Sequence, residues 1–233
     1  MRAVVMAGGN GARLAGVTTL PKPLAPIGGE LPIVEIVLRQ LARAGFRRAT
    51  VALGHRADLI RERLAGARPG LEVDFAVEDR PLGSAGPLAI IDDLPDDFLV
   101  MNGDLLTDLD PAALLAAHLA AGNDITVSVC RLRTPLGFGV VRYDAERRLL
   151  GMVETPAVEH EVNMGVYGMS RRVVGRLRPG EPTGFDALLA EGLARGDRIG
   201  VAPFAGEWHD IGTPESYARA NARWPELRAR IFR

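Results

Sequence analysis

The 233-residue chain has 47% hydrophobic and 24% charged residues, a composition typical of a soluble globular protein. Its 28 basic and 29 acidic residues nearly balance, which argues against nucleic-acid binding through a basic field. No stretch approaches 18 uninterrupted apolar residues, and the N-terminal apolar run meets glycines too soon for a signal peptide, so we expect a cytoplasmic protein without membrane contact. Cys130, the single cysteine, lies in an apolar run and is expected to be a packing residue.

The first predicted element is an apolar strand that ends in three glycines within four residues, Gly8, Gly9 and Gly11. Glycine permits positive φ and lets backbone N–H groups approach phosphate oxygens closely. Two cations, Arg13 and Lys22, follow within reach of such a loop and would offset buried phosphate charge. We therefore expect a triphosphate site at the start of the chain.

Two widespread phosphate-binding loops fit this stretch poorly. The dinucleotide fingerprint G-x-G-x-x-G would place its third glycine at Leu14. The P-loop pattern G-x-x-x-x-G-K-[ST] would place its lysine at Val17. A different kind of nucleotide site is needed to explain the glycines.

The chain then alternates between predicted helices and strands as far as residue 130. Apolar spacing and turn residues predict helices at 32–44, 58–65, near Ser84 and at 111–121, and strands at 49–53, 72–77, 98–101 and 124–130. Such alternation predicts an α/β fold of Rossmann-like type, with a mixed, mainly parallel sheet and helices on both faces.

The pattern changes after residue 130. Strands are expected at 137–143, 149–154, 161–169 and 199–203, and helices near 170–177, 185–195 and 214–223. The first three strands form a small β-rich subregion, which we expect to lie against the carboxyl ends of the parallel strands, where open α/β sheets bind ligands. The chain shows neither a linker nor a repeat, so we expect a single domain spanning residues 1–233.

One apolar strand ends in Asn102-Gly103-Asp104. A carboxylate at the carboxyl edge of a sheet can hold Mg²⁺ against a phosphate, because this ion prefers one or two carboxylates together with phosphate oxygens and water. Taken alone, the tripeptide equally suits a turn with a capping aspartate.

Two segments carry a family resemblance. Gly-Gly-x-Gly-x-Arg-Leu at residues 8–14, followed by Pro-Lys-Pro-Leu at 21–24, resembles the sugar-1-phosphate nucleotidylyltransferases, most closely their short mannose- or heptose-1-phosphate guanylyltransferase-like members. Residues 208–214, Trp-His-Asp-Ile-Gly-Thr-Pro, are similar to that family's Trp-x-Asp-Ile-Gly-Thr-Pro. The resemblance implies transfer of a nucleoside monophosphate from an NTP to a sugar 1-phosphate or a cyclitol phosphate. It also implies one Mg²⁺ shared by Asp104 and Asp210.

The resemblance implies a nucleotide-binding half at about 1–130 and a sugar- and metal-binding half at about 131–233. Catalysis would rest on Arg13, Lys22 and Asp104. The nucleotide would be bound by Ala7, Gly8, Gly9, Asn10, Gly11, Ala12, Arg13, Lys22, Glu78, Pro81, Gly83, Ser84, Asn102 and Gly103. The sugar phosphate would be bound by Gly139, Glu154, Asn163 and Gly165.

GTP is the favoured nucleotide. A carboxylate such as Glu78 can accept hydrogen bonds from both N1–H and the amino group of guanine. The helix expected near Ser84 would also point N–H groups at the base.

Two residues depart from the family pattern. Ala12 stands where threonine is usual, and Thr155 stands where a lysine would neutralise the sugar phosphate. Either Arg142 or His160 supplies that charge, or the acceptor binds differently, or activity is weak. A catalytically weak regulatory protein of this fold therefore stays open, as does a homo-oligomer. A nicotinamide-dependent dehydrogenase is a third hypothesis, which Leu14 disfavours.

Overall fold

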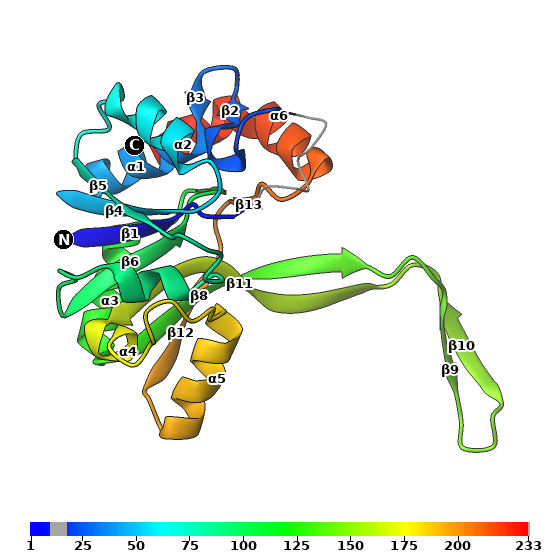
Figure 1. Cartoon of the computed structure of the whole chain (residues 1–233). Helices are drawn as coiled ribbons and strands as arrows, with labels where there is room; N and C mark the ends of the chain where they lie inside the picture. The colour runs from blue at the N-terminus through cyan, green and yellow to red at the C-terminus, as the bar shows by residue number, and fades with distance from the viewer. Residues whose placement is uncertain (10–17, 233) are drawn as a thin grey trace.

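The structure is a computed structural model that describes residues 1–9 and 18–232 (Figure 1). A seven-stranded sheet forms its centre, in the order β12-β8-β11-β6-β1-β4-β5. The strands are β1 (Arg2–Met6), β4 (Arg48–Leu53), β5 (Glu72–Val77), β6 (Asp97–Asn102), β8 (Ile125–Pro135), β11 (Ala157–Ser170) and β12 (Ile199–Phe204). Only β11 runs antiparallel to its neighbours, β6 and β8, while the other pairs are parallel. The predicted mixed, mainly parallel sheet is confirmed.

Helices cover both faces of this sheet. The helices α1 (Ile33–Arg43), α2 (Ala57–Ala65) and α3 (Pro111–Ala121) share one apolar cluster with the sheet. The 3-10 helix η3 (Gly86–Ile90) and the helices α4 (Arg171–Val174) and α5 (Phe185–Arg195) share another. Adjacent residues of β1 belong to different clusters, Val5 to the first and Val4 to the second. Because side chains alternate along a strand, the two clusters lie on opposite faces.

A third apolar cluster joins the long helix α6 (Pro214–Ile231) to short strands beside the sheet. These are β2 (Pro26–Ile27) with β3 (Leu31–Pro32), and β7 (Leu105–Thr107) with β13 (Trp208–Asp210). The sequence predicted that this helix ends at Arg223, but it continues through Pro225. Its buried side chains Ala220, Trp224, Leu227 and Ile231 keep helical spacing beyond the proline. Their burial offsets the roughly 3 kcal/mol that an interior proline costs.

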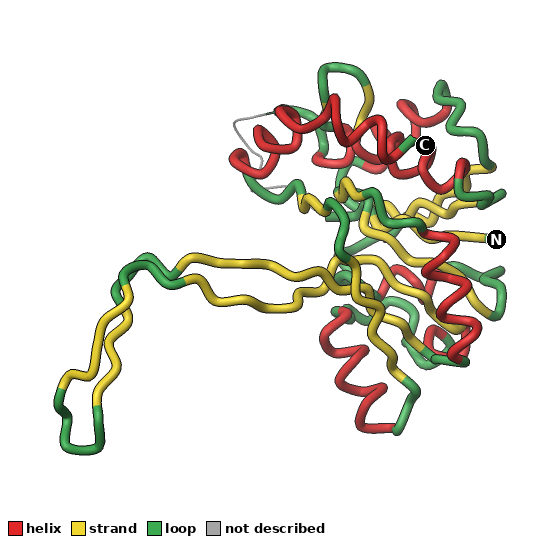
Figure 2. The backbone as a smooth tube through the Cα atoms, turned by 180° about the vertical axis from the view of Figure 1, so that it is seen from behind, coloured by secondary structure: helices red, strands yellow, loops and turns green. Residues whose placement is uncertain are grey.

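The strand expected at 161–169 is part of β11 and enters the central sheet. The rest of the β-rich subregion does not lie against the carboxyl ends of the parallel strands, as the sequence had suggested. It projects from the body as a long two-stranded ribbon (Figures 1 and 2). The pairing of β12 with β8 stops at Cys130, and β6 pairs with β11 only from Val166 onward. Beyond these points β8 and β11 pair with each other and lead into a hairpin of β9 (Val140–Tyr143) and β10 (Leu149–Val153). Residues 131–161 are called the arm below.

In the described part of the chain, no helix is both long and apolar enough to cross a membrane.

His118 ties α3 to the sheet. Its ring is buried beneath β11, with Nδ1 2.9 Å from Thr126 Oγ1 and Nε2 3.3 Å from Asp97 Oδ1. Burial lowers the pKa of His118 and outweighs the opposite effect of Asp97. The folded protein therefore resists protonation of a ring that the unfolded chain protonates freely.

This difference predicts a pH-dependent loss of stability. The unfolded chain protonates His118 with the ordinary pKa of about 6.5, whereas the folded protein has a lower pKa. The contribution of the neutral ring to the free energy of unfolding is therefore fully present above about pH 6.5 and is lost as the pH falls through the pKa of the folded protein. Urea denaturation between pH 7.5 and pH 5 should show the wild type losing more stability than His118→Gln, by at most about 1.4 kcal/mol per pH unit. Parallel pH profiles for the two proteins would contradict this role.

Candidate active site

The site lies where the sheet order changes direction. The chain starts at β1 in the middle, adds β4 and β5 on one side, and returns to add β6 on the other. Ligands of open α/β sheets bind in the crevice beside such a switch point, at the carboxyl ends of the strands. The loops after β1 and β6 touch there, and the Gly103 N–H donates to Met6 O at 2.7 Å. A Cβ on Gly103 would lie 3.1 Å from that oxygen, which explains the glycine in this tripeptide.

A cavity of about 360 Å³ opens at this edge. It is lined by Met6, Gly8, Gly9, Glu78, Pro81, Gly83, Ser84, Pro87, Asn102 and Asp104. All but Met6 and Pro87 were proposed from the sequence as nucleotide or metal residues. These two apolar residues carry no chemical motif, so only their position at the end of β1 and the start of η3 reveals them. Asn10, Gly11, Ala12 and Arg13 lie outside the described residues.

Besides Lys22, whose contacts are given below, two of the described residues proposed for the nucleotide do not line the cavity. Ala7 is buried, and its N–H donates to Ala52 O at 2.8 Å. Gly103 faces Met6 and Ala7 as described above. Their contribution is therefore to hold the two loops together, since their backbone groups contact protein.

Glu78 is fixed before any ligand binds. Its Oε2 accepts from the Leu82 N–H at 3.0 Å, and Oε1 lies over the backbone of Gly54 and Gly8. A Cβ on Gly54 would collide with Oε1, so this glycine, which the sequence analysis missed, makes room for the carboxylate. The signal was a glycine directly after the predicted strand 49–53. Burial raises the pKa of Glu78.

The segment around Ser84 differs from its expected form. The helix is a 3-10 helix that begins at Gly86, and the N–H groups of Ala85 and Gly86 both donate to Thr183 O, at 2.9 and 3.1 Å. They are not offered to a base. Ser84 Oγ accepts from Phe185 N at 3.0 Å. Gly83, at φ +77°, packs against the same Thr183 carbonyl, where a side chain has no space.

Asp104 and Asp210 come together because of one short strand pair. β13 runs antiparallel to β7 with Asp210 opposite Leu105, and Ile211 N donates to Asp104 O at 3.1 Å. Lys22, at the start of the 3-10 helix η2 (Lys22–Leu24), reaches between the two acids. Its ammonium forms an ion pair with Asp104 and lies 3.8 Å from Asp210 Oδ1. Both carboxylates therefore face the same cation, beside the cavity that Asp104 lines.

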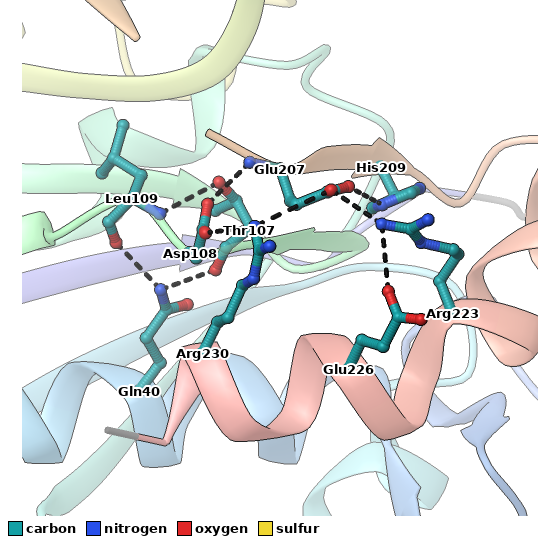
Figure 3. Close-up of polar contacts among 9 residues, drawn as sticks. All are labelled: Gln40, Thr107, Asp108, Leu109, Glu207, His209, Arg223, Glu226 and Arg230. Atoms are coloured by element: carbon teal, nitrogen blue, oxygen red, sulfur yellow. Dashed lines mark hydrogen bonds and ion pairs between the residues drawn. The ribbon is translucent and has the colours of Figure 1, made fainter. Parts of the chain in front are cut away.

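A polar network holds β13 and β7 in this register (Figure 3). Glu207 N donates to Asp108 Oδ1 at 2.7 Å, and the Glu207 carboxylate accepts from Arg223 of α6 at 2.9 Å. His209 Nε2 lies 3.2 Å from the same carboxylate. From the other side, Gln40 Nε2 of α1 donates to Thr107 O at 2.8 Å. His209 thus belongs to the support of the site and is turned toward Glu207.

The four expected sugar-phosphate residues fall into two places. Asn163 Oδ1 accepts from Gly165 N at 2.9 Å and its Nδ2 donates to the Tyr167 hydroxyl at 2.7 Å. Gly165, at φ +73°, lies directly against the side chain of Asn102, which lines the cavity, and Asn163 is joined to this wall through its bond with Gly165. Gly139 and Glu154 face each other on the arm, which projects from the body (Figure 1), and neither lines the cavity.

Arg142 and His160, the two candidates to replace the missing lysine, are exposed residues of the arm as well. Thr155 lies at the bend between the ribbon and its hairpin, with φ +43°. The structure therefore does not bring these residues to the cavity of their own chain.

Comparison with known proteins identifies the family. The family model described as nucleotidyl transferase matches residues 2–226, and the chain belongs to this family. Mannose-1-phosphate guanylyltransferase of Mycobacterium tuberculosis is 33% identical over 232 residues, which cover 94% of this chain and 63% of that protein. The catalytic subunit beta of the Dictyostelium discoideum mannose-1-phosphate guanylyltransferase is 30% identical, over 93% of this chain and 62% of that protein. The chain spans about three fifths of the length of these relatives.

Solved structures share the fold. HddC from Yersinia pseudotuberculosis superposes with a TM-score of 0.74 at 25% identity, covering 96% of this chain and 99% of that one. A putative glucose-1-phosphate thymidylyltransferase from Bacillus anthracis gives a TM-score of 0.75 at 24% identity, covering 95% and 94%. The α/β architecture predicted from the sequence is the architecture of these proteins.

Gly165 offers a test of how the cavity wall is built. Gly165→Ala adds left-handed strain of about 1 to 2 kcal/mol and a collision with Asn102, whose Cγ would lie 2.9 Å from the new Cβ. Gly196→Ala is the matched control, because Gly196 has φ +80° and nothing within 4 Å of a Cβ. We expect urea denaturation to show a larger loss of stability for Gly165→Ala, and nucleotide titration to show weaker binding for this variant alone. Equal effects of the two substitutions would contradict the packing of Gly165 on Asn102.

Proposed function

We propose that the protein transfers a nucleoside monophosphate from an NTP to a sugar 1-phosphate, releasing pyrophosphate and forming an NDP-sugar. The observation that carries this proposal is the convergence of Lys22, Asp104 and Asp210 beside a cavity lined by Gly8 and Gly9. Membership of the nucleotidyl transferase family supports it, as do the names of the relatives. The relatives' names make mannose 1-phosphate the first acceptor to test.

The reaction needs alignment and charge stabilisation more than proton transfer. The oxygen of the acceptor phosphate is already an anion, so it can attack the α-phosphorus without a general base or a covalent enzyme intermediate. The cavity would hold the nucleotide against the glycine backbone, where N–H groups approach its phosphates. Lys22, and Arg13 beyond the described residues, would offset the charge that develops as pyrophosphate leaves.

The two aspartates fit a divalent cation such as Mg²⁺. Both carboxylates face the Lys22 ammonium, and this shared contact with a positive group supports a cation site beside them. The described residues contain no cluster of three or more His, Cys, Asp or Glu able to hold a metal, so phosphate oxygens and water would complete the coordination. When bound, such a cation would neutralise the phosphates of donor and acceptor. Asp104 and Asp210 would hold it, and Lys22 would be freed to contact phosphate.

The proposed nucleotide is GTP. The Glu78 carboxylate lines the cavity, and the Leu82 N–H holds it in place. A carboxylate has about four lone-pair positions, so one bond to the backbone leaves acceptor capacity for the N1–H and amino group of guanine. The relatives named guanylyltransferases support this choice of base.

One observation favours a second candidate, a catalytically weak regulatory protein that binds nucleotide sugars. Gly139 and Glu154, expected at the sugar phosphate, lie on the arm and not at the cavity. A pyrophosphate-release assay over nucleoside triphosphates and sugar 1-phosphates separates the two candidates. An enzyme releases pyrophosphate, whereas a regulatory protein is stabilised by nucleotide or nucleotide sugar without turnover.

Asp104→Asn tests the role of the paired aspartates. Loss of one carboxylate removes charge that holds the cation, so we expect pyrophosphate release to fall by about 100-fold or more and half-maximal Mg²⁺ concentration to rise. Asp96→Asn is the control, because Asp96 is 86% exposed and pairs only with Arg171 in a surface ion pair. Wild-type turnover of Asp104→Asn with unchanged metal dependence would overturn this assignment.

Glu78→Gln tests the choice of base. The amide can keep the bond from Leu82 N through its oxygen but presents N–H donors where the carboxylate accepts. Donors facing the N1–H and amino group of guanine repel, so the preference for GTP over other triphosphates should fall by about tenfold or more, measured as a ratio of kcat/KM values. Asp79→Asn, at the adjacent exposed acid, should keep the wild-type ratio. An unchanged ratio in Glu78→Gln would show that the base is read elsewhere.

A further inference from the structure

The arm exposes most of the apolar side chains that the protein leaves to solvent. Sixteen large hydrophobic residues are exposed in the described part of the chain, and ten of them lie in the arm. These ten are Leu132, Leu136, Phe138, Val140, Val141, Tyr143, Leu149, Leu150, Met152 and Val153. Phe138 is 84% exposed and Leu149 69%. Concentrated apolar surface of this kind marks an interaction site, whereas single exposed hydrophobics are ordinary.

The arm also has open backbone edges. Among the described strands, β8 has no neighbour other than β11 beyond Cys130, and β9 and β10 pair only with each other. Two-stranded ribbons are marginally stable by themselves, and unpaired strand edges attract other chains. The arm therefore lacks the burial that would stabilise it in a single copy.

The β8–β11 ribbon has a regular register where it leaves the body. From Asn163 opposite Val129 to Ala157 opposite Pro135, the β8–β11 ladder runs without a shift in register. The single irregularity lies at the base, between Asn163 and Tyr167, where the two side chains are hydrogen-bonded to each other. This ladder and this bond hold the β8–β11 ribbon straight where it leaves the body.

The arm is complementary to itself. Residues 131–161 contain five arginines and five acidic residues, so two arms brought together carry no net repulsion. Arg131 lies opposite Glu161 and Arg133 opposite Glu159, which places both signs along the same stretch of ribbon. In the described part of the body, the six remaining exposed hydrophobics are dispersed over separate elements and form no comparable surface. They are Met1, Leu20, Val77, Leu119, Leu193 and Val201.

The size of the arm suits a stable interface. It spans residues 131–161, and standard interfaces use about 20 to 30 residues from each partner. Aromatic and large aliphatic side chains such as Phe138 and Tyr143 supply the anchors that carry most binding energy in such contacts.

We propose that the arm is a dimerisation element that packs against the arm of a second copy of this chain. The contact is isologous: the same residues of both copies meet about a two-fold axis. This proposal stands apart from the enzymatic function, because it depends on exposure, strand pairing and charge within the arm alone.

Sedimentation velocity and light scattering on the full chain test the proposal. We expect a species of twice the 24.9 kDa chain mass at micromolar concentration, dissociating on dilution. Leu149→Ser should raise the dissociation constant at least about tenfold, because a symmetric contact loses the side chain twice. Leu193→Ser is the matched control, since this leucine of α5 is 65% exposed outside the arm and should leave the constant unchanged.

A second variant and a second measurement guard against effects on folding. Phe138→Ser should weaken the dimer in the same way, with unchanged circular dichroism for all three variants. Hydrogen exchange should show arm amides protected in the wild type at high concentration and unprotected in Leu149→Ser.

Three results would overturn the proposal. A wild type that stays monomeric to about 100 µM excludes a dimer of ordinary affinity. If neither Leu149→Ser nor Phe138→Ser changes the dissociation constant, the dimer forms through a surface outside the arm. A monomer whose arm amides are protected has its arm folded on its own body.

Discussion

The pairing of β13 with β7 is the contact on which the candidate active site depends. Three residues of each strand suffice to place Asp210 beside Asp104, although more than 100 positions separate them in the chain. Two carboxylates held this close repel each other unless a cation lies between them, and Lys22 supplies one. The polar contacts of Glu207 and Gln40 around this pair hold its register, so α1 and α6 support the site although neither helix lines the cavity (Figure 3).

Several glycines around the cavity act through close packing. Gly103 lets the loops after β1 and β6 meet, Gly54 makes room for the Glu78 carboxylate, and Gly165 lies against Asn102. In each case a Cβ would meet backbone or a site residue, so a methyl group would displace part of the cavity wall. The cavity is thus largely formed before a nucleotide binds, which lowers the ordering cost of binding.

The arm and the body follow different stabilising principles. The body buries its apolar side chains in three clusters on and beside the sheet. The arm exposes such side chains on strands that no other described element covers. Covering them with a second copy would give the arm the burial that the body already has. The cavity lies beside the base of the arm, where Gly165 of β11 packs against Asn102.

The amino-acid sequence determined much of this protein through local signals. Alternating apolar runs and turn residues located the strands of the central sheet and the helices that cover it, but not the short strands β2, β3 and β7. Glycines, cations and acids at strand ends located most of the cavity, because parallel strands expose their carboxyl ends at one edge. Other features have no local signature. These features are contacts between segments that are separated in the chain. Thr183 accepts from the N–H groups of Ala85 and Gly86, the Glu78 carboxylate lies over Gly54, and Asp210 approaches Lys22. The sequence also predicted that the arm contains strands, but not that these strands project from the body. The ribbon leaves the sheet where β12 stops pairing with β8, at Cys130, and where β6 starts pairing with β11, at Val166.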